Sequence, residues 1–187
     1  MTSKFFERSP LVPLSTQDFG ASTTGTTIIT NERFRAFFRG AIDEVEIYYP
    51  EAFDSRLGTS LAKLPHLRKL TIFENDPNSP SELDWTTLCA KLRTIKTLEE
   101  LELGGDLLSD AAIAPLTGHP RLHTVTFSNG RLTSESLKIL RSLPALRKLV
   151  VFDQLYSEDF WISPSTYGYL TSALPGIEIN LGQRFPR

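Results

Sequence analysis

The sequence predicts an α/β fold, a right-handed leucine-rich solenoid (a short horseshoe) with about six parallel strands on its concave face and helices on its convex face. Residues 98–121 and 122–145 are two copies of one 24-residue unit, and residues 146–154 begin a third copy. Self-similarity at such a period is typical of a repeat solenoid. The apolar residues that open the three copies are Leu98, Leu101 and Leu103; Leu122, Val125 and Phe127; and Leu146, Leu149 and Val151.

The opening residues of each unit are expected to form a short strand. Side chains alternate between the two faces of a strand, so Leu101 and Leu103 point to one side while Glu100 and Glu102 point to the other. One short strand cannot bury its apolar side alone, and stacking equivalent strands in parallel builds the core. The second half of each unit has apolar residues at helical spacing. A helix is wider than a strand, so the stack is expected to curve.

Two other positions recur in the units. A hydroxyl residue stands just before each expected helix, where it can cap free backbone N–H groups; these residues are Ser109, Thr133 and Ser157. An apolar residue stands just ahead of each strand and is expected to be buried. The residues at that position are Phe38, Leu64, Ile95, Leu143 and Leu174.

The N-terminal part has a different composition from the units. Residues 1–27 are rich in Ser, Thr, Pro and Gly and predict a flexible arm, with the repeat domain spanning residues 28–187. The β-branched run at 26–30 predicts a short capping strand. Residues 31–40 predict a helix that begins after Asn31 and covers the end of the core with a phenylalanine face.

The units vary in length. The first is expected to begin at Ile42 and the second at Leu67, which lies 31 residues before Leu98, seven more than the basic period. The extra residues predict a loop and a longer helix with Ser81 as its N-cap. The last full unit is also long, and a strand at 176–181 is expected to close the domain.

The turn sequences at 107–116 and 131–140 resemble the short helical repeats of intracellular leucine-rich repeat proteins. They are similar in pattern to ribonuclease-inhibitor-like repeats and to those of bacterial and F-box leucine-rich proteins, over about residues 42–181. The resemblance implies a horseshoe that binds another protein. No F-box-like helix set precedes the repeats, which argues against a ligase adaptor. The asparagine typical of the strand end is present at Asn75 and replaced by Asp106, Gly130 and Gln154 in other units. The backbone N–H and C=O groups of those turns must therefore form hydrogen bonds with other partners.

Composition limits the cell compartment and the class of partner. The net charge of −2 favours neither a nucleic acid nor an anionic membrane as partner, since both attract basic surfaces. No run is long and apolar enough to span a bilayer, and the first residues do not resemble a signal peptide. A single cysteine, Cys89, cannot form an internal disulfide. A reducing, cytoplasmic setting is therefore expected.

The sequence predicts no catalytic residue, no cofactor and no metal ion. The three histidines, His66, His119 and His123, are expected in surface or turn positions, and Cys89 on the apolar side of a helix. They show no spacing typical of a metal site, and Gly104-Gly105 belongs to no phosphate-binding pattern. We therefore expect that the chain is not an enzyme.

The candidate binding residues lie at outward strand positions and in one loop. Apolar side chains at outward positions are typical of interface anchors, and the glutamates there predict an acidic face and a basic partner. Burial under a loop is the alternative for Phe73 and Phe152, and simple solvation is the alternative for the glutamates. In the segment 156–169, the repeat requires neither Phe160 nor Trp161, whose alternative role is a structural cap. The candidates are Tyr48, Phe73, Glu100, Glu102, Lys148, Val150, Phe152, Phe160 and Trp161.

The sequence favours a non-enzymatic module that binds a protein partner through its concave face and long loops. An alternative is a dedicated inhibitor or immunity-type protein that blocks a partner enzyme. A third possibility is an enzyme with a site in loop 153–169. No particular oligomeric state is predicted.

Overall fold

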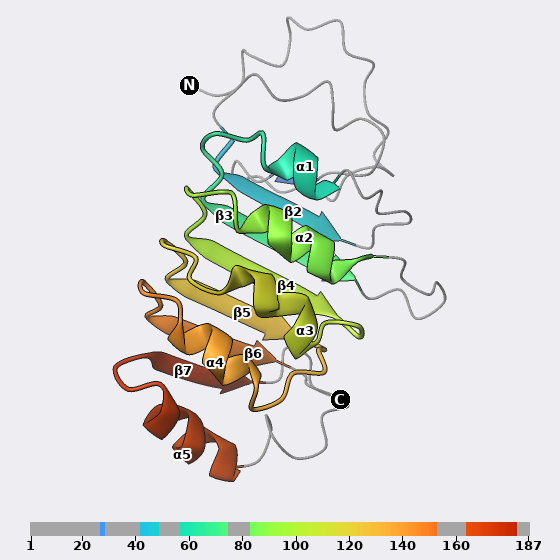
Figure 1. Ribbon diagram of the computed structural model, residues 1–187. Helices are drawn as coiled ribbons and strands as arrows, with labels where there is room; N and C mark the ends of the chain where they lie inside the picture. The colour runs from blue at the N-terminus through green and yellow to red at the C-terminus, as the bar shows by residue number, and fades with distance from the viewer. Residues whose placement is uncertain (1–26, 29–41, 49–56, 75–82, 153–163, 183–187) are drawn as a thin grey trace, which may run out of the picture.

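A computed structural model shows the chain as a solenoid of strand–helix units (Figure 1). It describes residues 27–28, 42–48, 57–74, 83–152 and 164–182. Seven strands form one sheet in sequential order, and every neighbouring pair is parallel. The helices lie on one face of the sheet (Figure 1). The predicted α/β solenoid is confirmed; the arm, the helix at 31–40 and the residues Phe160 and Trp161 lie outside the described residues.

The elements alternate along the chain. The strands are β1 Thr27–Ile28, β2 Glu44–Tyr48, β3 Lys69–Glu74, β4 Glu100–Gly105, β5 Thr124–Ser128, β6 Lys148–Phe152 and β7 Glu178–Gly182. The helices are α1 Leu57–Leu61, α2 Trp85–Leu92, α3 Asp110–Ile113, α4 Ser136–Arg141 and α5 Pro164–Ala173, and a 3-10 turn at Ala114–Leu116 follows α3. β1 pairs with β2 and so confirms the predicted capping strand.

The core is a ladder of apolar side chains between the sheet and the helices. Leu101 pairs with Leu70 on one side and Val125 on the other, and Val125 pairs with Leu149. All four are buried, so the predicted inner ladder is confirmed. Each strand begins later than its unit, because the opening leucine packs in a turn; the N–H of Leu98, for example, donates to the carbonyl of Ile95.

The helix starts show which predicted caps form. Ser109 accepts a hydrogen bond from the N–H of Ala112, as predicted. For α2 the prediction was wrong, because Asp84 and not Ser81 is the N-cap and accepts from the N–H of Thr87 at 3.0 Å. An aspartate carboxylate is as good an acceptor there as a serine hydroxyl.

The turns of the third and fourth units are connected by hydrogen bonds that involve no asparagine side chain. The carboxylate of Asp110 accepts hydrogen bonds from the N–H and the hydroxyl of Thr133 in the next unit, at 3.0 and 2.6 Å. The N–H of Arg131 donates to the carbonyl of Leu108. Side-chain and backbone groups of one unit thus satisfy the turn of the next.

His119 lies in the turn just ahead of a strand, as predicted, but it occupies the recurring core position there and is not on the surface. Its exposed fraction is 0%, and Ile95, Leu143 and Leu174 are buried at the equivalent position. His119 Nε2–H donates to the carbonyl of Ile95 at 3.0 Å, and Nδ1 accepts from the N–H of Leu122 at 3.3 Å. The imidazole is accommodated because each ring nitrogen has a backbone partner.

This environment favours the neutral imidazole. Burial is the main cause that holds the pKa of His119 below its ordinary value of 6.5, and the positive charges of Lys96 and Arg93 act in the same direction. The hydrogen bond to the Ile95 carbonyl opposes this shift. A proton on Nδ1 would also face the N–H groups of Arg121 and Leu122, which donate to that atom.

The Leu101→Ala variant tests the inner ladder. Removing this side chain leaves a cavity between sheet and helices and should lower the free energy of unfolding by about 2–5 kcal/mol. Leu107 is half exposed, so Leu107→Ala is the matched control and should change stability little. Urea denaturation of the three proteins measures the effect. Equal loss in both variants would contradict the proposed core.

The buried histidine predicts a pH dependence of stability. Because the folded-state pKa of His119 lies below the ordinary 6.5, the unfolded chain takes up a proton first as pH falls. Its contribution to stability should be complete above about pH 6.5 and be lost as the pH falls from there through the folded-state pKa. His119→Leu, the residue type found at this position in other units, should remove this part of the dependence while His66 and His123 remain. Identical stability–pH curves for the wild-type protein and His119→Leu would contradict this prediction.

Candidate binding face

The sheet face turned away from the helices is called the open face, and the residues on it form three rows across the strands. The first row is Glu44, Lys69, Glu100, Thr124, Lys148 and Glu178. The middle row is Glu46, Thr71, Glu102, Thr126, Val150 and Asn180. The end row is Tyr48, Phe73, Gly104, Ser128, Phe152 and Gly182. The backbone register alone places Tyr48, whose side chain lies outside the described residues.

The lysines of the first row are balanced by glutamates on the neighbouring strands. Lys69 Nζ pairs with Glu44, and Lys148 Nζ pairs with Glu178 at 2.8 Å. The hydrogen bond to Glu44 is the main cause that raises the pKa of Lys69. Among the described residues, the three rows of the open face hold five glutamates and two lysines. Glu46, Glu100 and Glu102 lie on β2 and β4.

The end row packs aromatic rings over glycines. A Cβ atom on Gly104 would lie 2.5 Å from Cδ1 of Phe73, and a Cβ on Gly182 would lie 2.9 Å from Cε1 of Phe152. Each ring thus covers the glycine of the next strand, a contact that compensates for the missing side chain. Phe73 is only 7% exposed; the loop that was expected to cover it lies outside the described residues. Phe152 is half-buried.

The predicted binding residues form two groups on the open face. Phe73, Glu100 and Glu102 lie together on β3 and β4, whereas Lys148, Val150 and Phe152 lie on β6. β5 separates the groups by about 10 Å, twice the usual strand spacing. It presents only small hydroxyl residues, Thr124, Thr126 and Ser128. Val150 is buried to 7% exposure, and Phe160 and Trp161 lie outside the described residues.

Part of the segment 156–169, which contains the predicted binding residues Phe160 and Trp161, is helical. Residues 164–169 belong to α5, so the expected loop ends earlier than predicted. On this helix Leu170 is buried, whereas Tyr167 and Tyr169 are half exposed. Tyr169 directly precedes Leu170, and adjacent residues on a helix do not share a face.

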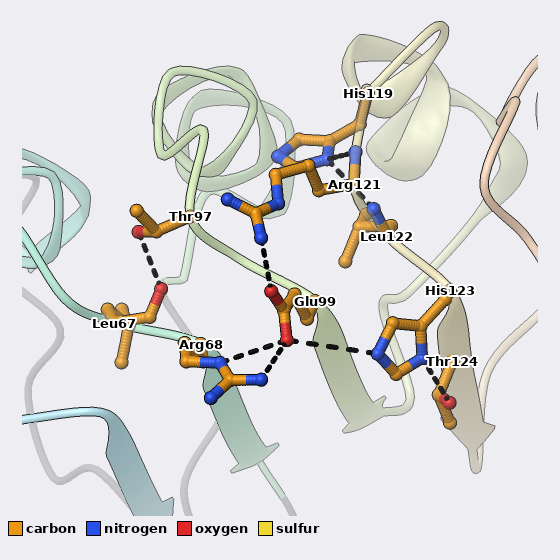
Figure 2. A network of polar contacts seen from close by, with 9 residues as sticks. All are labelled: Leu67, Arg68, Thr97, Glu99, His119, Arg121, Leu122, His123 and Thr124. Atoms are coloured by element: carbon orange, nitrogen blue, oxygen red, sulfur yellow. Dashed lines mark hydrogen bonds and ion pairs between the residues drawn. The ribbon is translucent and has the colours of Figure 1, made fainter.

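A polar cluster at the start of the strands was missed by the sequence analysis. Figure 2 shows Glu99 between Arg68 and Arg121. Nε and Nη2 of Arg68 donate to Glu99 Oε2 at 2.9 and 2.6 Å, and Nη2 of Arg121 donates to Oε1 at 2.7 Å. His123 Nε2 lies 3.9 Å from Oε2. The available signal was the residue after each opening leucine, which is charged or histidine at Arg68, Glu99 and His123.

In the described part of the chain the cysteine is buried and no metal cluster is present. Cys89 is buried in α2, and burial raises the pKa of its thiol to about 12. Within the described ranges no set of three His, Cys, Asp or Glu residues is placed to hold a metal ion. None of the helices described is long and apolar enough to cross a membrane.

Comparison with known proteins finds no family model, no curated protein and no solved structure that matches this chain. Its function must therefore be inferred from the geometry and charge of its own residues.

The contact between Phe73 and Gly104 can be tested by adding one methyl group. Gly104→Ala must displace the ring or the strand and should lower the free energy of unfolding by about 1–3 kcal/mol. A Cβ atom added to Gly168, on α5, would meet no other atom within 4 Å, so Gly168→Ala is the control. It should stabilise the helix by up to about 1 kcal/mol. Gains in stability from both substitutions would show that the ring does not cover Gly104.

Proposed function

We propose that the chain is a non-enzymatic interaction module of the leucine-rich repeat type, which binds a basic segment of a partner protein across the open face. The observation that carries this proposal is that, among the described residues, the open face bears five glutamates and two lysines. Three of these glutamates, Glu46, Glu100 and Glu102, lie on β2 and β4.

The acidic part of the face suits a lysine or arginine side chain. Glu100 and Glu102 are half-buried on one strand, and Glu46 lies in the same row as Glu102, two strands away. The hydroxyl of Thr71 is the group between them, and it donates to Glu102 at 3.5 Å. A cation that enters here meets several carboxylates on a rigid sheet, which speeds association and fixes orientation.

The rest of the open face supports binding of an extended or loop segment. β5 presents hydroxyl groups, which both donate and accept hydrogen bonds. Phe152 on β6, the next strand, is half-buried and adds apolar surface beside these hydroxyl groups. Positive and apolar groups on one partner segment would thus match the two groups of predicted residues.

The Glu100→Gln/Glu102→Gln variant tests this function on a partner captured from the native cell. The amides keep the size of the side chains and remove two charges, so the Kd for that partner should rise by about tenfold or more and depend less on salt. Asp106→Asn/Glu135→Gln removes two exposed charges elsewhere and is the matched control. Calorimetric titration with the purified partner measures both.

Cross-linking of the wild-type complex locates the contact. Cross-links from the partner should reach Lys69 and Lys148, which flank the acidic group on the open face. A captured partner that binds the double variant and the control equally well would contradict the proposal.

A further inference from the structure

We infer a second interaction surface, along the edge of the sheet where the strands begin, which binds a carboxylate-rich segment of another protein. This start edge is built around Arg68, Arg121 and Arg147, with Lys63, Arg93 and Lys96 in the turns that lead into the strands. It is separate from the open face, so it does not depend on the function proposed above.

The centre of the start edge is a pair of guanidinium groups held in place by one carboxylate. Glu99 has only 12% of its side chain exposed, whereas Arg68 and Arg121 have 63% and 56% exposed. The carboxylate therefore lies beneath the two arginines (Figure 2). Arg68 uses Nε and Nη2 on Glu99, and Arg121 uses Nη2. The remaining N–H donors of both groups are left for a ligand, because a guanidinium carries five of them.

The pre-positioning of these arginines favours binding. Ordering a flexible side chain costs free energy when a ligand binds, and here the bonds to Glu99 have already restricted both side chains. His123 extends the cluster on the far side of Glu99, with its Nδ1 hydrogen-bonded to the hydroxyl of Thr124 at 3.0 Å. The site is therefore more than a chance accumulation of mobile cations.

Further cations surround the pair, and they exceed the acids at this edge. Arg147 follows His123 at the same position of the next strand, where its N–H donates to the His123 carbonyl. Lys63, Arg93 and Arg147 are exposed and form no ion pair with a described residue. The acids nearby are Asp43, Glu44, Glu99, Glu100 and Glu178, of which Glu44 and Glu178 pair with lysines of the open face.

The geometry favours a carboxylate ligand from a protein over a nucleic acid. Glu99 itself shows that a carboxylate fits between Arg68 and Arg121. A continuous phosphate backbone along the edge would pass Asp43 and Glu100, which repel it. Stacking of bases needs aromatic platforms, and of the two imidazoles in Figure 2, that of His119 is buried and only that of His123 is accessible beside the arginines. An acidic protein segment can place its carboxylates at the guanidinium pair and leave neutral residues opposite the acids.

The Arg68→Gln/Arg121→Gln variant tests this surface. Fluorescence anisotropy with a labelled oligoglutamate peptide should show binding to the wild-type chain that weakens as salt is added. The variant should raise the Kd by about tenfold or more, as expected for lost charge-assisted hydrogen bonds. Arg131→Gln/Lys138→Gln removes the same charge from exposed positions outside the edge and should leave the Kd unchanged. Melting temperatures of all variants control for folding. An equal rise in Kd in both variants would overturn the proposal.

The Glu99→Gln variant distinguishes binding by arginines that Glu99 holds in place from attraction by net charge alone. It makes the protein more positive, so attraction by net charge alone would lower the Kd for oligoglutamate. If Glu99 holds the arginines in place, the Kd should instead rise severalfold. A lower Kd, or tighter binding of a single-stranded oligothymidylate than of oligoglutamate, would overturn the proposal of a carboxylate-binding edge. Neither result bears on the open face, whose test uses Glu100 and Glu102.

Discussion

Parallel pairing between equivalent residues of successive units is the constraint on which the rest of this structure depends. It places Leu70, Leu101, Val125 and Leu149 in one buried ladder. Because strand side chains alternate, the same register fixes which residues reach the open face and which lie at the start edge. A shift of one residue would exchange the core with the open face. The spacing of the surface groups therefore follows from the packing of the core, and a partner would meet charges at intervals set by the strands.

The period of the sequence made the units, their order and the inner ladder predictable, because burial of apolar side chains repeats with the chain. Contacts between neighbouring units were not predictable in the same way. The position of Phe73 over Gly104 and the ion pair between Glu99 and Arg68 depend on the rotamers of side chains on neighbouring strands. His119 was missed because polarity suggested a surface position, whereas two backbone partners make its burial acceptable. Of the predicted site, the acidic group on β4 is placed by the register, and Phe160 and Trp161 lie outside the described residues.

Charged residues at the helix ends follow the common direction of the units. Every helix runs antiparallel to the strands, so all helix C-termini point toward the start edge (Figure 1). Partial negative charge at helix C-termini favours cations, and partial positive charge at N-termini favours acids. Arg93 follows α2 and Arg141 ends α4, while Asp84 and Asp110 stand at helix starts. In a bundle of alternating helices these effects would cancel across the molecule. In this solenoid the described helices share one direction, so the partial charges at their ends have the same sign along each edge.

The bond between His119 and Ile95 also has a consequence for how the domain unfolds. In a solenoid each unit contacts only its neighbours, and stability is approximately a sum of contributions from units and from the interfaces between them. His119 belongs to the third unit and Ile95 to the second, so this bond contributes to one interface only. Loss of that contact would weaken the cooperativity between the two sides of the stack rather than the stability of every unit. The bond thus couples the unit that contains α2 to the unit that contains β4 and α3, and its loss would leave the other interfaces of the stack unchanged.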